Sequence, residues 1–158
     1  YSYRRCWGSA HVENRKPFWE TKKLRELNQA EWESLCDGCG QCCLIRFEDT
    51  KTGSVGATSV VCRLFEIESC RCSHYPERHQ LVQDCVRLDA DSVSDLSWLP
   101  NTCAYRLLDE GLPLYEWHPL IAGNGDEIRR AGVSVYGNVI SEKNVHPDDL
   151  AWQIVRWV

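Results

Sequence analysis

The pattern of apolar and polar positions early in the chain predicts a short helix that leads into a run of cysteines. Asn28 can cap this helix, and Glu31 occupies the third helical position, where it closes a capping box with that asparagine. Leu27 and Trp32 fall at the two positions of a hydrophobic staple. We expect this helix to deliver the chain to Cys36.

A β-hairpin is predicted directly after the cysteine run. Residues 44–48 and 55–62 are rich in β-branched and aromatic side chains, and residues 49–53 between them have the composition of a turn. The two ends of such a hairpin lie side by side. We therefore expect Cys43 and Cys62 to approach each other.

Three short helices are predicted in the middle of the chain, at residues 76–81, 91–99 and 102–109. Pro76 opens the first, Pro100 halts the second and Gly111 terminates the third. This arrangement places Cys85 in the loop after the first helix. It places Cys103 at the start of the third.

The last part of the chain contains no cysteine and is expected to contribute residues to the hydrophobic core. Residues 133–140 alternate between apolar and polar as a strand does, and Pro147 begins a final helix. Three apolar residues fall on one face of that helix: Leu150, Ile154 and Trp157. The pattern predicts a C-terminal strand-helix unit.

Length and composition predict one folded domain. The chain has 158 residues, of which 43% are hydrophobic, and it shows no repeat or linker that would separate a second domain. Its uncharged stretches fall far short of the roughly 20 apolar residues that a membrane span needs, so we expect no span. The formal net charge of −5 argues against a broad nucleic-acid-binding face and leaves a local RNA contact open.

The chain has far more cysteines than it needs for folding, because its other apolar residues suffice to form a hydrophobic core. Cys6 stands apart from the other nine of the ten cysteines, which we take as candidate metal ligands. These nine are Cys36, Cys39, Cys42, Cys43, Cys62, Cys70, Cys72, Cys85 and Cys103. Small secreted domains use disulfides in place of a core, whereas this chain has apolar residues for a core and an odd number of clustered thiols. We therefore expect free thiols in a reducing intracellular compartment.

Four of the nine cysteines form the run CDGCGQCC at residues 36–43. A C-x2-C step lets two thiolates converge on one metal, and here two such steps are fused. Gly38 and Gly40 permit the backbone to curl around an inorganic centre. Cys42 and Cys43 are adjacent, and adjacent side chains diverge unless the backbone is strongly bent. Two neighbouring centres or one polynuclear centre are therefore expected rather than one mononuclear ion.

The number of thiols leaves the kind of centre open. Nine suffice for two four-thiolate sites with one thiol left over, or for a bridged cluster. A C-x2-C-x2-C run with a remote fourth cysteine is typical of iron–sulfur proteins, and zinc ribbons use separated C-x2-C pairs. The spacing favours one or two iron–sulfur clusters, with [4Fe-4S] ahead, and keeps Zn²⁺ as the alternative cofactor.

Packing in a hydrophobic core explains one or two free cysteines but not nine.

Other side chains near the cysteines are weaker candidates for metal binding. His74 follows Cys72 by two positions and could supply a nitrogen ligand, but an exposed loop histidine is the favoured interpretation. His118 is interpreted as a core or groove residue. Carboxylates beside the thiols are expected to be solvated, because a thiolate cluster repels them: Asp37, Glu66, Glu68 and Asp84.

Residues 1–16 are expected to form an N-terminal arm ahead of a cysteine-cluster domain at 17–158. The chain has no methionine, and its start carries Arg4 and Arg5 with no acidic residue before Glu13. This composition fits the remnant of an organelle presequence, which would place the protein in the mitochondrial matrix, as well as it fits a cloning artefact. Without a presequence, the bacterial cytoplasm is the expected compartment.

Several long segments of the chain resemble the YcgN-like cysteine-cluster proteins of the zinc- or iron-chelating CxxCxxCC family. They are PFW at 17–19, EWESLCDGCGQCCL at 31–44, CRLFEIESCRCSHYPERHQLVQDCVRL at 62–88, WLPNTCAYRLL at 98–108, WHPL at 117–120 and AGVSVYGNVISE at 131–142. The resemblance implies a bacterial metal-binding protein without an agreed reaction. A more distant relative with a similar cluster, a flagellin lysine methylase, implies that iron–sulfur occupancy is an option. The long segment before PFW, with Cys6 in it, departs from the family and favours an organellar version.

These observations predict a small, irregular α+β metal-cluster domain with a β-hairpin, short helices and a C-terminal strand-helix unit. Its predicted function is metal binding through a chiefly structural iron–sulfur or zinc centre, in a protein that could be a subunit of a larger organellar assembly. The alternative is an iron–sulfur redox or radical-type enzyme acting on a protein or a small substrate. No phosphate loop, nucleophile–base pair or nucleotide signature identifies a reaction, so catalytic residues stay unassigned.

Overall fold

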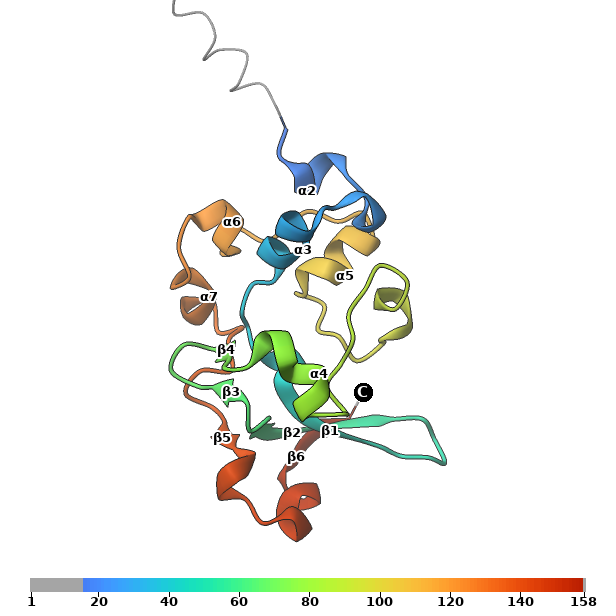
Figure 1. Ribbon diagram of the computed structural model, residues 1–158, viewed down its shortest axis with the longest axis vertical. Helices are drawn as coiled ribbons and strands as arrows, with labels where there is room; N and C mark the ends of the chain where they lie inside the picture. Colours follow the sequence, from blue (N-terminus) through green and yellow to red (C-terminus); the bar gives the residue numbers. More distant parts are fainter. Residues whose placement is uncertain (1–15, 158) are drawn as a thin grey trace, which may run out of the picture.

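Short helices and two small sheets make up the structure, a computed structural model that describes residues 16–157 (Figure 1). The predicted α+β class is confirmed. Before the first strand the helices, with 3-10 helices labelled η, are α2 (Phe18–Thr21), η1 (Leu24–Glu26), α3 (Gln29–Leu35) and η2 (Gln41–Cys43). The later helices are η3 (Tyr75–Glu77), α4 (Arg78–Leu81), η4 (Val93–Asp95), α5 (Ala104–Asp109), α6 (Pro119–Ala122), α7 (Glu127–Arg130), η5 (Glu142–Asn144) and η6 (Pro147–Gln153). Within residues 16–157, none of these helices combines the length and apolar character of a membrane span.

Helix α3 begins as its sequence predicts. The Asn28 side chain accepts a hydrogen bond from the Glu31 N–H at 2.9 Å, and the Glu31 carboxylate accepts one from the Asn28 N–H at 3.0 Å. This is the expected capping box. Leu27 and Trp32 both pack against the same hydrophobic cluster. Cys36 caps the other end of the helix with an extended backbone, so the chain leaves α3 at the first cysteine of the run.

Strand β2 is the centre of the larger sheet. The strands are β1 (Leu44–Glu48), β2 (Val55–Val61), β3 (Phe65–Glu66), β4 (Arg71–Cys72), β5 (Ile140–Ser141) and β6 (Ile154–Trp157). β1 and β2 pair antiparallel and form the predicted hairpin. β2 also pairs with β5 in parallel and with β6 antiparallel, while β3 and β4 form a separate antiparallel pair. Because β2 has partners along both edges, Thr58, Val60 and Val61 are almost fully buried.

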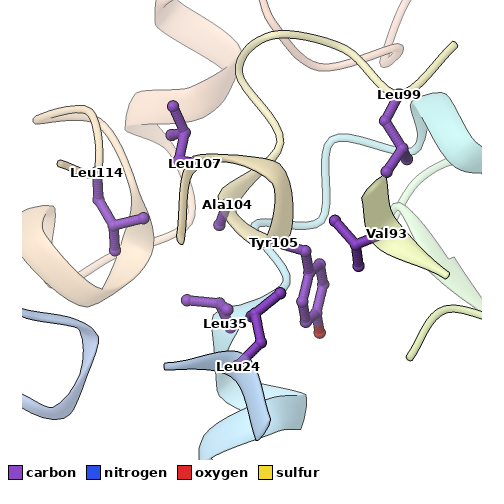
Figure 2. Packing of buried hydrophobic residues seen from close by; sticks show 8 residues of the cluster. All are labelled: Leu24, Leu35, Val93, Leu99, Ala104, Tyr105, Leu107 and Leu114. Atoms are coloured by element: carbon purple, nitrogen blue, oxygen red, sulfur yellow. The ribbon is translucent and has the colours of Figure 1, made fainter. Parts of the chain in front are cut away.

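Two hydrophobic clusters form the core. The first surrounds α5, as Figure 2 shows, and contains Leu24, Leu35, Val93, Leu99, Ala104, Tyr105, Leu107 and Leu114. The second lies beside the two sheets and contains Val61, Phe65, Cys70 and Val135. The segment at 36–43 runs from α3 to β1 (Figure 1) and joins these clusters along the chain, because Cys43 and Leu44 pack against the second cluster.

The predicted strand at residues 133–140 is wrong, because only its last residue enters a strand, β5. A turn interrupts the alternating pattern: the Asn138 N–H donates to the Val135 carbonyl at 3.0 Å, and Gly137 has a φ of 85°. The Val135 N–H donates to the Cys39 carbonyl at 2.9 Å. This segment therefore supports the cysteine loop instead of extending the sheet.

The predicted C-terminal helix is also corrected by the structure. It is the 3-10 helix η6, which begins at Pro147 as expected but ends at Gln153. The chain then continues as β6, so Ile154 and Trp157 lie in a strand instead of on one helix face. An extended conformation lets this β-branched segment, Ile154-Val155, share the backbone hydrogen bonds of the β2 edge. The C-terminal unit is therefore strand, helix, strand.

Of the three helices predicted in the middle of the chain, the first and third are present and the second is much shorter than predicted. η3 and α4 fill the first predicted range, and α5 begins at the residue after Cys103, which is its N-cap as expected. The helix predicted at 91–99 is reduced to the three residues of η4. Its first turn is replaced by hydrogen bonds from the N–H groups of Asp91 and Ser92 to the Asp89 side chain, which compete with helix formation.

The predicted boundary between an arm and a domain concerns residues that the structure largely does not describe. Residues 1–15, which include Cys6, Arg4 and Arg5, lie outside the described range. The division into an arm at 1–16 and a domain at 17–158 stays a prediction.

Candidate metal centre

The cysteine run forms a tight loop between α3 and β1. The Asp37 Oδ1 accepts a hydrogen bond from the Cys39 N–H at 3.0 Å, which turns the backbone between the first two cysteines. Gly40 has a φ of 81°, and a Cβ atom there would lie 2.6 Å from Cγ2 of Val135 and 2.7 Å from Cζ of Phe65. Only glycine fits this position. Gly40 therefore has a conformation and a packing environment that require glycine, whereas a curl of the backbone around an inorganic centre stays a prediction.

Hydrogen bonds from two side chains hold the loop in place. The Gln41 Nε2 donates to the Val133 carbonyl at 2.9 Å. The Arg46 guanidinium donates to the carbonyls of Gln41 and Cys42, at 3.1 and 2.9 Å, and lies 3.6 Å from the ring centroid of Trp98. Sequence reasoning missed Arg46, because nothing in the local pattern distinguishes it from a solvent-facing strand residue.

The remote cysteines stand where secondary-structure elements begin or end. The Cys62 N–H donates to the Cys43 carbonyl at 2.9 Å, so the predicted approach of the two hairpin ends is confirmed. Cys72 ends β4, Cys85 lies in a turn after α4, and Cys103 is the N-cap of α5. Each of these positions is fixed by a neighbouring element.

One group of thiols lies within electrostatic range of each other near the ends of α3 and α5. It consists of Cys36, Cys39, Cys42 and Cys103. Burial, and then the charge of Cys42, raises the pKa of Cys36 to about 12. Burial is also the main cause of the raised pKa of Cys39 and of Cys103, and Cys42 adds to both. The Cys36 side chain still keeps exposed surface, so protein atoms crowd its sulfur while one side stays open to solvent.

A second group of thiols surrounds the hairpin base. It consists of Cys43, Cys62, Cys72 and Cys85. The neighbouring Cys42 thiol is the main cause of the raised pKa of Cys43, followed by burial and by the charges of Cys62 and Cys72. Burial raises the pKa of Cys62 and of Cys85, Cys72 adds to both, and Cys42 also adds to that of Cys85. These four thiols are therefore electrostatic neighbours.

Cys42 and Cys43 connect the two groups. The neighbouring Cys43 thiol is the main reason that the pKa of Cys42 is lowered to about 7, and the Arg46 guanidinium contributes to this lowering. The expectation that Cys42 and Cys43 do not both bind one mononuclear ion stays a prediction. The 3-10 turn of η2 bends the backbone enough to bring both thiols together.

Cys70 lies apart from these groups, in the second hydrophobic cluster. Its Sγ donates to the Ile67 carbonyl at 3.4 Å and lies 3.6 Å from the Ser134 Oγ. The Arg129 guanidinium donates to the same sulfur at 3.9 Å. Cys70 therefore has packing and hydrogen-bond partners of its own.

All nine predicted ligands are free thiols. Within residues 16–157, no three His, Cys, Asp or Glu side chains are grouped tightly enough to hold a metal ion as they stand. The structure thus gathers eight thiols as neighbours without placing them in ligand geometry. The assignment of the nine cysteines as metal ligands stays a prediction.

Two buried side-chain oxygens beside the first thiol group have no hydrogen-bond partner among the described residues. They are Oδ2 of Asp37, next to Cys36, and Oγ1 of Thr102, next to Cys103. The expectation that Asp37 is solvated is wrong: its side chain is buried in the loop, and burial raises its pKa. The other three carboxylates expected to be solvated are exposed: Glu66, Glu68 and Asp84.

Two histidines take the positions that the sequence favours. His118 is buried in the core, with its Nε2 2.8 Å from the Leu35 carbonyl and its Nδ1 accepting from the Leu120 N–H at 3.0 Å. His74 is exposed and forms a hydrogen bond with Ser73 at 2.9 Å. Both of the ring nitrogens of His118 are therefore used within the core.

The fold and the thiol groups define a small α+β cysteine-cluster protein. A family model described as "Putative zinc- or iron-chelating domain", CxxCxxCC, matches residues 35–104, which contain all nine cysteines of the cluster. The chain belongs to the UPF0260 family, which includes the YcgN-like proteins that it resembles.

Relatives in this family align with nearly the whole chain. A UPF0260 protein of Cellvibrio japonicus is 55% identical over 141 residues, which cover 89% of this chain and 96% of the relative. One from Allorhizobium ampelinum is 49% identical, covering 90% and 89%, and one from Parvibaculum lavamentivorans is 47% identical, covering 90% and 93%. No solved structure matches the chain. These relatives are bacterial and lend no support to a mitochondrial location or to a role as an assembly subunit.

Proposed function

We propose that this protein binds iron or zinc through its clustered cysteine thiolates and that the main role of the metal centre is to hold the fold together. The family description supports metal binding and names both metals. The observation that carries the proposal is the crowding of eight thiols into two adjoining groups.

Crowded thiols can become anionic together only in the presence of a cation. Burial is the main cause of the raised pKa of five of them: Cys36, Cys39, Cys62, Cys85 and Cys103. Each thiolate also raises the pKa of its neighbours, so the groups resist deprotonation by themselves. A bound metal replaces the thiol protons and turns this repulsion into attraction. An all-thiol donor set fits iron or zinc, because magnesium and calcium require oxygen ligands.

The unpaired oxygen beside Cys103 also fits a thiolate-held centre. The Thr102 hydroxyl is buried without a hydrogen-bond acceptor among the described residues. Hydroxyl groups next to metal-binding thiolates donate hydrogen bonds to sulfur and tune the metal. Thr102 is therefore suited to support Cys103 as a ligand.

A structural role follows from where the thiols lie in the core. Cys103 packs against the first hydrophobic cluster, and Cys43 packs against the second. Both clusters are small, with eight and four buried residues. A metal centre held by these thiols would tie the clusters together, and its binding energy would count as folding energy.

Iron–sulfur is the form that we favour, because the C-x2-C-x2-C spacing with remote cysteines is typical of cubane ligation. Elemental analysis and an absorption spectrum of anaerobically purified protein test this. We expect iron and a broad band at about 400 nm. Zinc without visible absorption would overturn the iron–sulfur form and keep metal binding. A folded protein without bound metal would overturn the proposal.

Chelation tests the structural role separately. We expect the cooperative thermal transition of the metal-loaded protein to be lost, or shifted far downward, once elemental analysis shows that the metal is gone. Restoring the metal should restore the transition. An unchanged melt of protein that is proven metal-free would show that the centre does not hold the fold together.

The enzyme alternative gains no support from the hollows described in the structure. A hollow of about 420 Å³ lies beside α2 and the 108–113 segment, and none of its lining residues is a cysteine. A smaller one beside Arg46 and Trp98 is lined by no cysteine either. Free thiols in place of disulfides favour a reducing compartment as the working environment.

A further inference from the structure

We infer that the outer edge of strand β6 is a docking site for a partner protein, which binds through an extended segment that carries acidic and apolar side chains close together. The site combines an unpaired backbone edge, two exposed apolar side chains and two arginines without acidic partners. The inference does not depend on the proposed metal binding.

Strand β6 forms one edge of the larger sheet. It pairs with β2, and no other strand within residues 16–157 pairs with it. Apart from that pairing, no backbone hydrogen bond joins residues 154–157 to another described segment. An unpaired strand edge presents N–H and C=O groups, with which an extended chain can form hydrogen bonds.

Two apolar side chains at this edge are largely exposed. Trp152, near the end of η6, is 83% exposed, which is the largest value among the exposed apolar residues that the structure describes, and Val155 is 69% exposed. Val155 is the extra residue of a β-bulge, because the residues on either side of it pair with β2 and it does not. Singly exposed apolar residues are ordinary, but here two of them accompany an unpaired backbone edge, a combination that favours binding of another chain.

A row of three paired residues crosses the sheet to this edge. Arg46 in β1 pairs with Ala57 in β2, and Ala57 pairs with Arg156 in β6. Directly paired residues place their side chains on the same face of a sheet. Because neighbouring strands lie about 4.8 Å apart, the Cα atoms of the two arginines are about 10 Å apart, with a small alanine side chain between them.

The two arginines have only neutral partners among the described residues. Arg46 donates to backbone carbonyls of the cysteine run, and Nη2 of Arg156 donates to Oε1 of Gln41 at 3.4 Å. No carboxylate within residues 16–157 forms an ion pair with either guanidinium. Arg156 is exposed. The face therefore carries two uncompensated positive charges, which attract an acidic side chain.

The space between the arginines is too small for a free ligand. A hollow of about 10 Å³ lies there, and both arginines, Ala57 and Trp98 are among its lining residues. This volume holds about one water-sized group. An acidic side chain carried by a chain that lies along β6 needs only enough room for a carboxylate oxygen, so a macromolecular partner fits this surface better than a small molecule does.

The spacing along β6 specifies the chemistry of the partner segment. Val155 and Arg156 are consecutive, so the segment must present an apolar and an acidic side chain close together. A nucleic acid fits less well, because its affinity comes from many phosphate contacts and this chain has a net charge of −5. A second copy of the chain also fits less well, because docking β6 against β6 would bring two Arg156 side chains to one short contact, where like charges repel.

Fluorescence anisotropy of a labelled synthetic peptide in which glutamate and leucine alternate tests the inference on the protein as purified. We expect binding that weakens with added salt, and roughly tenfold weaker binding by both Arg156→Glu and Trp152→Ala. Both positions are exposed, and circular dichroism checks that the variants are folded. The control is Lys23→Glu, which reverses an exposed charge two residues after α2, at the far end of the molecule from β6 (Figure 1), and should bind like the wild type.

The same peptide with lysine in place of glutamate provides a charge exchange. It should bind Arg156→Glu better than the wild type, a gain that general damage to the fold would not produce. Absence of binding by the glutamate peptide, or equal binding by Arg156→Glu and Lys23→Glu, would overturn the inference. Tighter binding of a single-stranded oligouridylate that displaces the peptide would assign the surface to nucleic acid instead. A stable dimer of the peptide-free protein in sedimentation, with the β6 amides protected from hydrogen exchange, would assign the edge to a second copy.

Discussion

The Nε2 of His118 donates a hydrogen bond to the Leu35 carbonyl at 2.8 Å. The Nδ1 of the same ring accepts from the Leu120 N–H at 3.0 Å, which assigns the proton to Nε2. Leu35 is the last residue of α3 and is fully buried immediately before Cys36. A buried histidine therefore fixes the point at which the helix passes into the cysteine loop.

Replacing this histidine should be costly. His118→Ala leaves the Leu35 carbonyl and the Leu120 N–H without partners and opens a cavity, so we expect a loss of about 3 kcal/mol in the free energy of unfolding, measured by denaturant titration. His74→Ala is the matched control: that side chain is exposed, and the change should be within about 0.5 kcal/mol, with metal content unaltered. Equal effects of the two substitutions would contradict the role of His118.

The loop should tolerate no side chain at Gly40. In Gly40→Ala the new Cβ would meet Val135 and Phe65 at 2.6 and 2.7 Å, and alanine would have to adopt a left-handed backbone. We expect a loss of about 2–5 kcal/mol from strain and overpacking, measured by thermal or denaturant unfolding. Gly53→Ala separates the two causes, because Gly53 is also left-handed but has open space around it, so only about 1 kcal/mol should be lost. Similar losses would show that the contacts at Gly40 do not matter.

The buried Asp37 should be replaceable with a gain in stability. Asp37→Asn keeps the acceptor for the Cys39 N–H and removes a charge whose Oδ2 has no partner among the described residues. We expect the protein as purified to become about 1 kcal/mol more stable. Asp95→Asn, at an exposed position, should change little. Loss of metal in Asp37→Asn would instead place the free oxygen on the metal.

The capping box of α3 should contribute measurable stability. Asn28→Ala removes the acceptor of the Glu31 N–H and should cost about 1 kcal/mol in the free energy of unfolding. Asn28→Asp preserves a good capping side chain and should remain within a few tenths of a kcal/mol of the wild type. If the alanine and aspartate variants unfold at the same denaturant concentration, the cap is not stabilising.

Glu31 should make stability depend on pH in the acidic range. A hydrogen bond from the Asn28 N–H, followed by one from Lys22, lowers the pKa of Glu31 below its usual value of 4.5. The unfolded chain therefore binds the proton more readily, so this stabilisation is present above pH 4.5 and is lost as the pH falls through the lowered value. Glu31→Gln should be less stable than the wild type at pH 7, and the difference should shrink in acid. A constant difference across the range would contradict the linkage.

Local sequence patterns predict the elements that depend on neighbouring residues. The cap of α3 and the β1–β2 hairpin are correct because capping boxes and turns act over a few positions. The same reasoning fails at residues 133–140, where an alternating pattern suggests a strand. There the Val135 N–H finds its partner in the Cys39 carbonyl, almost a hundred residues earlier, and no local rule contains that contact.

The sequence by itself determined the chemistry available to this protein: nine clustered thiols, a cysteine run that contains two glycines, and long segments that resemble the zinc- or iron-chelating CxxCxxCC family. Only the tertiary structure decided which thiols are neighbours, that Cys70 belongs to the core and that Asp37 is buried. The reason is physical. Residue types and short spacings specify donors and turns, whereas proximity depends on contacts such as that of Tyr105 with Trp32, which join segments far apart in the chain.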